Sequence, residues 1–396
     1  MRRVLFTYER NIPTVSLTYE MFHRPEFLNK DLVVTFKCIK DVTKADIANN
    51  DVLYMIRPND VISKKLAKQA HKSGLFVLFF CDDDLFHLPK DLPNIPYRRR
   101  CLKKCLVNSN IFVTNGEYLA KQRYEQTIDK RYYLANTIVQ ADEMVSHEDN
   151  EVIKFLYAGS VTHKSLFNMY LAPIFGKLVE KYGKQISFTF IGVHPDVEQY
   201  MEKTNIEFYG SMPLEKYREY VKKNNFDYGL APLIANEFTK CKYFNKYLEY
   251  TLSGIVGVYS KVEPYTFVIK NGENGFLVDD NPDAWFECLD KLISDKKDRK
   301  RILDNAQQHV KNNFSAEEVF ADIFKNVPEY LNHNRGDGKV YGLGLAKLNY
   351  RIHRMFDIIY LSFFYLFRKG PIGLIKQVKL HKKEMKAMKK LEENNL

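Results

Sequence analysis

The residues of this 396-residue chain that are best suited to chemistry gather late in the sequence, in the segment KCKYFNKYLEYTLSGIVGVYS. Its pattern predicts a helix from about Lys242 to Leu252, ended by Gly254. Lys242, Lys246 and Glu249 are spaced by four and three residues, which would place them on one helical face. This face is either a solvated ion pair or a site where ammonium groups neutralise a phosphate and the carboxylate accepts hydrogen bonds from ribose hydroxyls.

A second candidate site is the run FLYAGSVTHKS, in which an apolar stretch is followed by a helical pattern. Its polar and glycine residues are Gly159, Ser160, Thr162, His163 and Lys164. Backbone N–H groups at the start of a helix attract anions, and a neighbouring ammonium group adds to that attraction. The alternative is a glycine turn with a capping hydroxyl and a solvated lysine.

Short apolar runs alternate with longer amphipathic stretches, a pattern typical of βαβ units and parallel sheets. Two series of strands are predicted, on either side of the polar segment 136–150. The first series is Arg3–Tyr8, Leu32–Cys38, Asp51–Ile56, Leu75–Cys81, Ile111–Thr114 and Tyr132–Leu134, and the second is Lys154–Ala158, Ile186–Ile191, Ile206–Tyr209, Tyr228–Ala231, Ile255–Tyr259 and Gly275–Val278. Because doubly wound sheets bind ligands at the carboxyl ends of their strands, we expect both candidate sites at one such edge.

This organisation predicts an α/β protein with two Rossmann-like doubly wound domains facing a cleft. Residues 1–145 would form the first domain and residues 146–335 the second, which a helix capped by Ser315 would close. Residues 336–396 would form a linker and a basic helical tail.

Several protein classes are disfavoured by what the sequence lacks. It contains neither G-x-G-x-x-G nor G-x4-G-K-[ST], which argues against a dinucleotide oxidoreductase and a P-loop NTPase. Its six cysteines form no C-x2-C pair, so neither a zinc ribbon nor a dense disulfide framework is indicated and a reducing compartment is expected. The amino terminus is a poor signal peptide, and we expect no stretch to be long and apolar enough to cross a membrane.

The second half of the chain resembles the donor-binding domain of glycosyltransferases with the GT-B fold, especially glycosyltransferase family 4, the group 1 glycosyltransferases. The resemblance follows family order over about 130 residues, through YAGSVTHKS, IGVHPDVEQY, IEFYGSMPLEKYREYV, FDYGLAPL and NKYLEYTLSGIVGVYSKVEPYTFVIKNGENGFLVDD. One departure stands out, because many members carry a glutamate eight residues before the position of Glu249, and here that residue is Cys241.

The resemblance implies a site for a nucleotide-sugar donor in the second domain. Glu249 would bind the ribose, and the lysines would neutralise the diphosphate and act as catalytic groups; they are Lys164, Lys242 and Lys246. Residues around Gly192, Tyr209, Gly210 and Met212 would form the pocket for the base, while Gly159, Ser160 and His163 complete the donor set. No metal or other cofactor is expected, since lysines already supply the countercharge.

The first domain resembles the family's acceptor domain less closely. Arg57 and the Asp82–Asp83–Asp84 cluster follow predicted strands, so we expect Arg57, Asp82 and Asp84 on the acceptor side and Asp83 as a catalytic carboxylate. The three carboxylates could instead cap a turn, or hold Mg²⁺ or Mn²⁺ beneath a diphosphate. The basic run Arg98–Arg99–Arg100, with Lys103 and Lys104, is most simply a solvated helix face, with binding of an anionic acceptor as the alternative.

The chain carries a net charge of +11, most of it at the carboxyl end. Residues 341–396 hold twelve Lys or Arg and four Asp or Glu, a net of +8, whereas residues 1–340 hold only +3. Lys347, Arg351 and Arg354 recur at helical spacing beside an apolar face. The tail therefore resembles an in-plane anchor on anionic lipid, with packing on the first domain as the alternative and nucleic-acid binding disfavoured.

Together these observations predict a glycosyltransferase of the hexosyltransferase type, peripheral on the cytoplasmic face of a membrane. It would move a sugar from a nucleotide diphosphate to a hydroxyl of a glycan or lipid-linked acceptor, with retention of configuration, in the assembly of cell-surface polysaccharide or glycoconjugate. Two alternatives stay open at this point: a GT-B-fold nucleotide-sugar epimerase and a non-catalytic, membrane-bound carbohydrate-assembly protein.

Overall fold

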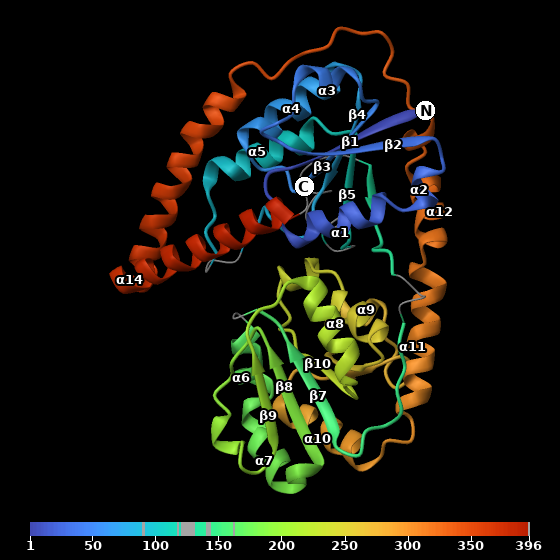
Figure 1. Ribbon diagram of the computed structural model, residues 1–396, viewed down its shortest axis with the longest axis vertical. Helices are drawn as coiled ribbons and strands as arrows, with labels where there is room; N and C mark the ends of the chain where they lie inside the picture. The colour runs from blue at the N-terminus through green and yellow to red at the C-terminus, as the bar shows by residue number, and fades with distance from the viewer. Residues whose placement is uncertain (89–91, 117–118, 120–130, 140–143, 161–162, 395–396) are drawn as a thin grey trace. The chain divides into compact units, whose positions relative to one another are not determined.

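The computed structural model of the protein describes residues 1–88, 92–116, 119, 131–139, 144–160 and 163–394, with side chains as far as residue 379. Thr162 of the second candidate site lies outside the described residues. The chain divides into two compact units (Figure 1): a first unit of Met1–Ala135 with Ile323–Leu396, and a second unit of Asn136–Asp322.

The division differs from the predicted domain limits at both ends. The first unit ends at Ala135 instead of residue 145, and the segment from Ile323 to residue 335, expected in the second domain, groups with the first unit. Aromatic packing explains the second difference, because the ring of Phe324 stacks on Phe27 at 5.6 Å and Tyr330 meets the same ring edge-on at 5.5 Å.

The first unit is built on a six-stranded parallel sheet in the order β2-β1-β3-β4-β5-β6. Its strands are β1 (Arg2–Tyr8), β2 (Leu32–Cys38), β3 (Val52–Ile56), β4 (Phe76–Phe80), β5 (Ile111–Thr114) and β6 (Tyr132–Leu134). The central strands read VLYMI and FVLFF and are buried along their whole length. Continuous apolar runs of this kind are what a parallel sheet covered on both faces requires.

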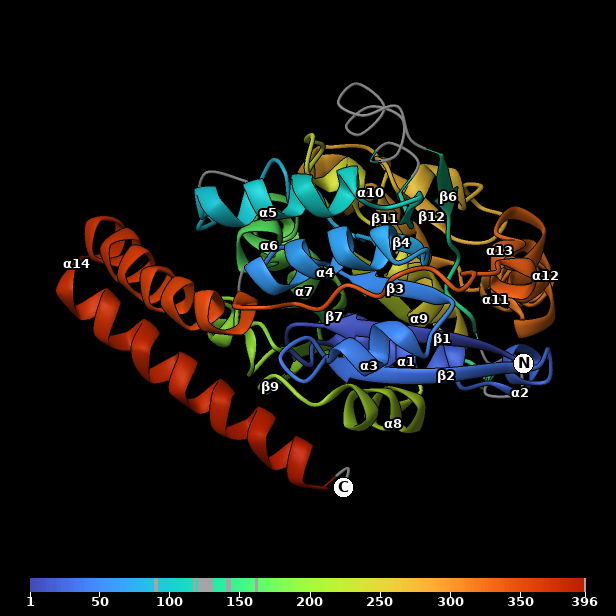
Figure 2. The ribbon, with the colours of Figure 1, turned by 90° about the horizontal axis from the view of Figure 1, so that it is seen from above.

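Helices cover both faces of this sheet (Figures 1 and 2). They are α1 (Pro13–Phe22), α2 (Pro25–Leu28), α3 (Lys44–Ala48), α4 (Val61–Lys72), α5 (Pro96–Val107) and α13 (Glu329–Asn332), while α12 (Ala316–Asn326) crosses from the second unit and α14 (Ala346–Asn394) packs against α4. Local capping starts several of them: Asp60 accepts hydrogen bonds from the N–H groups of Ile62 and Ser63 at the start of α4. The predicted cap of α12 is also present, since Ser315 Oγ accepts from the Glu318 N–H at 3.3 Å.

The second unit has a six-stranded parallel sheet in the order β12-β11-β10-β7-β8-β9. Its strands are β7 (Ile153–Ala158), β8 (Ile186–Ile191), β9 (Asn205–Tyr209), β10 (Tyr228–Ala231), β11 (Val256–Ser260) and β12 (Phe276–Val278). Its helices are α6 (Lys164–Tyr170), α7 (Ala172–Tyr182), α8 (Leu214–Asn224), α9 (Asn245–Leu252), α10 (Pro282–Ser294) and α11 (Arg299–Phe314), with 3₁₀ turns at Gly183–Gln185, Glu198–Tyr200, Thr239–Cys241 and Tyr265–Phe267. One apolar core packs α6, α7 and α10 on one face of the sheet, and another packs α8, α9 and α11 on the other.

The predicted fold class is confirmed: every predicted strand is present, with ends shifted by no more than one residue. The two sheets and their helices are doubly wound parallel α/β structures.

The long helix α14 departs from the prediction for the tail. It bends at Gly370, whose φ of 66° and ψ of −179° are not helical, and Pro371 follows. Part of Ala346–Lys379 is long and apolar enough to cross a membrane, judged by length and composition alone, which corrects the expectation that no stretch would be.

Candidate active site

The carboxyl edge of the second unit's sheet brings together two segments that are about 80 residues apart in the chain. Gly159 and Ser160 follow β7, His163 precedes α6, and α9 begins after β10. The pKa of His163 is lowered by burial and then by the nearby ammonium groups of Lys246 and Lys242. The predicted meeting of the two candidate segments therefore takes place in the structure, around a histidine that stays neutral at pH 7.

Two glycines allow the loops at this edge to approach closely. Gly192 follows β8 with a φ of +75°, and a Cβ there would lie 2.3 Å from the carbonyl oxygen of Gly159. A Cβ on Gly159 would in turn lie 2.7 Å from the His163 ring. His163 Nδ1 lies 3.0 Å from Ser160 Oγ and accepts from the Ser160 N–H at 3.2 Å, so the ring is held across the loop.

Lys246 is the most enclosed of the predicted cations. Its Nζ donates to Glu249 Oε2 at 2.7 Å and to Tyr217 Oη at 3.4 Å, and it lies over the rings of Tyr217 and Tyr250, 5.2 and 5.6 Å from their centroids. Burial alone lowers the pKa of Lys246, but the Glu249 carboxylate outweighs it and the net shift is upward. The lysine is therefore charged, and the Glu249 carboxylate offsets that charge.

The helix around these residues is shorter than predicted. It begins at Asn245, three residues after Lys242, which has extended backbone at the end of the Thr239–Cys241 turn. Lys242 therefore does not share a helical face with Lys246 and Glu249, and its ammonium group lies 5.2 Å from the Phe238 ring centroid. The aromatic residues Tyr243 and Phe244, which pack inward, take the place of the first predicted turn.

The remaining predicted donor-site residues lie in different surroundings. Lys164 starts α6 and donates to Asp196 Oδ1 at 2.6 Å, beyond the end of β8. Tyr209 ends β9, packs against Tyr220 at 4.8 Å and donates to Glu207 at 3.3 Å. Met212 packs on the apolar core, and a Cβ on Gly210 would meet no atom within 4 Å, so open space adjoins this loop.

Cys241, at the position where many glycosyltransferases of family 4 have a glutamate, is buried. Its thiol lies 3.3 Å from the carbonyl oxygen of Glu237, so this side chain faces its own backbone turn.

The carboxyl edge of the first unit's sheet holds a second charged cluster. Arg57 follows β3 with a left-handed φ of 47°, uncommon for a residue other than glycine. Its Nε donates to Asp82 and its Nη2 donates to Asp83 at 2.7 Å, while Thr14 Oγ1 donates to the other oxygen of Asp82 at 2.9 Å. Burial acts to lower the pKa of Arg57, but the two carboxylates raise it overall. One guanidinium thus faces two partly exposed carboxylates.

Asp84 has a different position from its two neighbours. Its side chain is fully buried and accepts hydrogen bonds from the backbone N–H groups of Phe86 and His87, each at 3.1 Å. This is the position of a turn-capping carboxylate, one of the alternatives that the sequence left open, and we leave Asp84 out of the proposed site.

Three neighbours of the site were missed at the level of sequence: Tyr217 and Tyr250 beside Lys246, and Thr14 beside Asp82. Tyr217 and Thr14 lie near the amino ends of helices that follow strands, a place where ligand contacts are common in doubly wound sheets. That position is the signal that could have found them.

Among the described residues, no group of three or more His, Cys, Asp or Glu side chains is arranged to hold a metal ion. Arg57 already neutralises part of the charge on Asp82 and Asp83, the carboxylates that the metal alternative would use.

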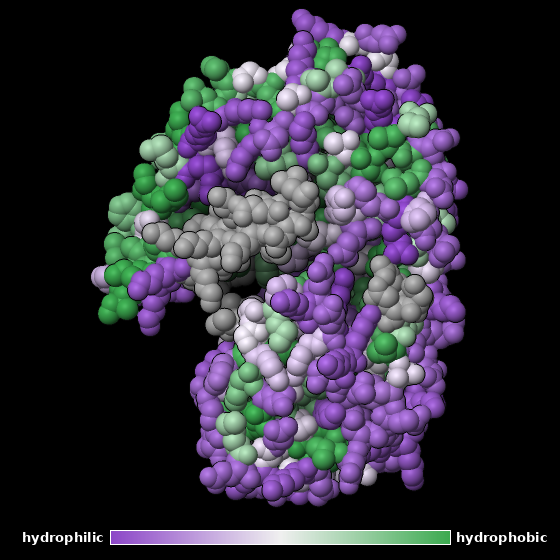
Figure 3. Space-filling view, in the orientation of Figure 1, coloured by the Kyte–Doolittle hydropathy of each residue, from purple (hydrophilic) through white to green (hydrophobic). Residues whose placement is uncertain are grey.

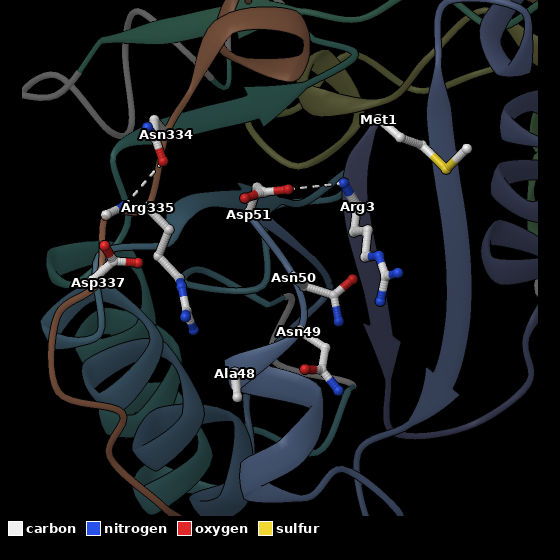
Figure 4. A pocket seen from close by; sticks show the side chains of 10 residues that line it. Met1, Arg3, Ala48, Asn49, Asn50, Asp51, Asn334, Arg335 and Asp337 are labelled. Atoms are coloured by element: carbon white, nitrogen blue, oxygen red, sulfur yellow. Dashed lines mark hydrogen bonds between the residues drawn. The ribbon is translucent and has the colours of Figure 1, made fainter.

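A pocket of about 340 Å³ lies elsewhere in the first unit, near the amino ends of β1 and β3 (Figure 4). Arg3, Asp51 and Arg335 are among its lining residues. It contains none of the predicted site residues and lies at the opposite end of the strands from Arg57 and Asp82.

Comparisons with known proteins agree with this geometry. Residues 153–295 match the family model described as glycosyl transferases group 1. No curated protein is matched by sequence. HepE of Anabaena, in a structure with UDP-glucose, has 12% identity and a TM-score of 0.60 over 83% of this chain and 100% of its own. Sucrose-phosphate synthase of Thermosynechococcus elongatus has 9% identity and a TM-score of 0.60, over 82% and 98%. The lipopolysaccharide outer core galactosyltransferase WaaB has 15% identity and a TM-score of 0.53, over 83% and 99%.

At these identities the structural likenesses show the fold, which is the GT-B fold of glycosyltransferases. Together with the group 1 match in the second unit, these structural likenesses support the assignment of the protein as a glycosyltransferase. The family model that matches residues 153–295 describes the group 1 glycosyltransferases. Membership of glycosyltransferase family 4 itself stays a prediction.

Proposed function

We propose that the protein transfers a sugar from a nucleotide-diphosphate donor to a hydroxyl of a glycan or lipid-linked acceptor, with retention of configuration, in cell-surface polysaccharide or glycoconjugate assembly. The observation that carries the proposal is the Lys246–Glu249 pair at the carboxyl edge of the second unit, near His163. This edge lies within the segment that matches the group 1 glycosyltransferases.

In the proposed donor complex, Lys246 turns from Glu249 toward the diphosphate, with Lys242 nearby. The Tyr217 and Tyr250 rings limit access of water to the ammonium group, which strengthens its attraction for phosphate oxygens. Glu249, released from the lysine, accepts hydrogen bonds from the ribose hydroxyls. Cations that stabilise the departing diphosphate lower the barrier most directly, because negative charge develops there as the sugar leaves.

On the acceptor side, the proposal assigns the first unit's cluster of Arg57, Asp82 and Asp83. Asp83 is held by one guanidinium hydrogen bond and is partly exposed, so one of its oxygens is available to orient or deprotonate an acceptor hydroxyl. Asp82 is bound by both Arg57 and Thr14 and serves to hold the arginine in place. No metal or other cofactor takes part in this proposal.

We also place the enzyme peripherally on the cytoplasmic face of a membrane. The basic tail and the exposed apolar side chains of α14 support this location.

A nucleotide-sugar binding screen tests the proposed activity. UDP-, GDP-, dTDP- and CMP-sugars are titrated into the purified full chain, and we expect one base to bind at micromolar to millimolar Kd. Lys246→Ala should lose that binding or turnover, whereas the exposed Lys311→Ala on α11 should keep both. If no nucleotide sugar binds, the proposal is wrong.

A donor-only incubation with the sugar that binds separates transfer from epimerisation. The proposal expects the donor sugar to be recovered with its configuration unchanged when no acceptor is present. Recovery of an epimer would identify the chain as a nucleotide-sugar epimerase instead.

A further inference from the structure

Helix α14 presents a long row of apolar side chains to solvent. Phe363 and Phe367 are 55% and 84% exposed, in contrast to the buried aromatics of both sheets. The other exposed apolar residues of this helix, as far as its side chains are described, are Leu348, Ile352, Met355, Phe356, Ile358, Ile359, Ile372, Ile375 and Val378. Figure 3 shows hydrophobic residues gathered along α14 at the left edge of the first unit. A patch of this size on a soluble domain marks an interaction surface.

The opposite face of the same helix is joined to the first unit by a buried ion cluster. Asp357 is 1% exposed and accepts from Arg98 Nη2 at 2.6 Å, and Arg98 Nη1 donates to Glu9 at 2.7 Å. Tyr350 adds a hydrogen bond to Glu9 at 2.9 Å. We call Glu9, Arg98, Tyr350 and Asp357 the Arg98 cluster. Arg98 is thus largely buried, which corrects the prediction of a solvated helix face at this residue, whereas Arg99 and Arg100 are exposed as predicted.

The Arg98 cluster attaches the start of α14, and with it the apolar row, to one edge of the first unit's sheet. Glu9 directly follows β1, so the cluster lies at the carboxyl edge of the sheet, the edge that also holds Arg57 and Asp82. Burial acts to raise the pKa of Glu9, but Arg98 outweighs it and lowers that pKa to about 2, so Glu9 is ionised at neutral pH. A buried, fully paired cluster of this kind holds the first turns of α14 in one orientation.

Two features indicate that α14 lies on a membrane instead of crossing it. The most apolar stretch with few charges is Ile358–Ile375, and Arg368, Lys369 and the bend at Gly370 fall near its middle. A straight span would bury both cations in hydrocarbon, where a charged side chain is strongly unfavourable. The two halves, each about 36 Å long at 1.5 Å per residue, instead fold back on one another in a V, which both ribbon views show (Figures 1 and 2).

The charge of the tail indicates which surface it meets. Residues 341–396 carry a net of +8, and described basic side chains flank the apolar row, including Lys347, Arg351 and Lys376. Basic side chains beside an exposed apolar face suit anionic headgroups above an acyl layer.

We propose that α14 is a bent membrane-surface arm whose two halves insert their apolar row into the headgroup region of an anionic bilayer, and that the Arg98 cluster fixes this arm to the carboxyl edge of the first unit's sheet. The arm specifies the mode and the attachment point of the membrane association proposed above, and in that respect it rests on the proposed function. The acceptor-side cluster then belongs to the edge of the unit that carries the lipid-binding arm.

Vesicle sedimentation tests the surface. The full chain should sediment with vesicles of equal parts phosphatidylglycerol and phosphatidylcholine and much less with pure phosphatidylcholine. Phe363→Glu/Phe367→Glu should reduce the sedimented fraction at least tenfold, while the matched pair Met169→Glu/Met201→Glu, on exposed residues of the second unit, should leave it unchanged. Unchanged binding of the phenylalanine variant would overturn the proposal. A second result would also overturn it: the full chain forms a dimer without lipid, does not bind vesicles, and is converted to a monomer by the phenylalanine substitutions. A second copy of the chain would then cover the apolar row.

Depth measurements distinguish an in-plane arm from a span. Phe363→Trp, Phe367→Trp and Ile375→Trp are compared in vesicles brominated near the headgroup or near the acyl end, with the buried Trp285 as a constant background. An in-plane arm predicts stronger quenching by the shallow bromines at all three positions. A span predicts the deepest position for Phe367→Trp, and that result would overturn the proposal.

Hydrogen exchange tests the attachment. Asp357→Ala should raise the exchange rate of the Ala346–Asp357 amides at least tenfold and keep vesicle binding, whereas the exposed Asp41→Ala should change neither. Tyr350→Phe, which removes a single hydroxyl, should give a smaller rise and guards against misfolding of the first variant. Unchanged exchange in both variants would refute the attachment. Nucleotide-sugar binding in solution should survive in Phe363→Glu/Phe367→Glu, so loss of the surface and loss of the proposed activity remain separate results.

Discussion

The two sheets carry charged clusters at the same topological position, yet with opposite balances of charge. In the second unit, Lys246 faces one carboxylate, Glu249. Lys242 adds a second positive charge nearby, since both lysines lower the pKa of His163. In the first unit, Arg57 faces two carboxylates, Asp82 and Asp83. One edge therefore has cations to spare and suits an anion, while the other has a carboxylate to spare and suits a hydroxyl group. The same sheet architecture supports both kinds of site because the residues of the loops and helices that follow the strands, and not the sheet, set the charge.

The largest expected effect comes from removing the cation at the second unit's edge. Lys246→Ala should lower turnover by a factor of roughly 100 or more, equivalent to about 2.7 kcal/mol of transition-state stabilisation. Steady-state kinetics with the donor identified by the binding screen measures it, with Lys311→Ala as the control. Near wild-type transfer by Lys246→Ala would contradict the assignment of this edge to the diphosphate.

The corresponding change at the first unit's edge should affect chemistry without affecting donor binding. Asp83→Asn keeps the shape of the side chain and an acceptor oxygen for Arg57, but it removes the basic oxygen proposed to meet the acceptor hydroxyl. We expect kcat to fall by about 10- to 100-fold, with the Kd for the nucleotide unchanged. Equal losses in kcat and nucleotide affinity would show that the two edges do not divide the work as proposed.

Glu249 offers a sharper test of the second edge, because a sugar hydroxyl is the group it would recognise. Glu249→Gln should weaken the binding of a ribonucleotide diphosphate by about tenfold, consistent with the loss of a charge-assisted hydrogen bond. The wild-type chain should prefer the ribonucleotide over its 2′-deoxy form, and the variant should prefer it much less. If the variant keeps the full preference, Glu249 does not contact the ribose. Calorimetric titration with both nucleotides gives the comparison directly.

The smallest effect concerns His163, which senses both lysines. In the free protein its pKa lies below the usual 6.5, because it is buried near Lys246 and Lys242. A bound diphosphate would offset these positive charges and raise the pKa of His163. Binding should therefore take up a fraction of a proton, and the affinity for the nucleotide should increase by less than about threefold as the pH falls through the range between the pKa values of the free and bound protein. The ring resonances, assigned by His163→Gln, report the pKa with and without UDP. A pKa that does not move on binding would place the diphosphate elsewhere.

Pattern alone located the strands because parallel strands covered on both faces must be continuously apolar, as in VLYMI and FVLFF. It also placed Lys246 and Glu249 on one helical face, since a spacing of three residues is local geometry. It failed at Lys242, because packing of Tyr243 and Phe244 delays the start of α9, and at Arg98, whose partners Glu9 and Asp357 come from distant parts of the chain.

The sequence by itself thus determined the two parallel sheets, the edge that bears the candidate residues, and a tail both basic and apolar. These depend on periodicity and composition, which each segment carries on its own. Only the tertiary structure decided that both lysines lie near enough to His163 to lower its pKa, that Asp84 turns inward to cap a loop while Asp83 stays partly exposed, and that α14 is held by Asp357. Such pairings depend on which distant side chains can satisfy one another's charge once they are withdrawn from water, and no local pattern records that.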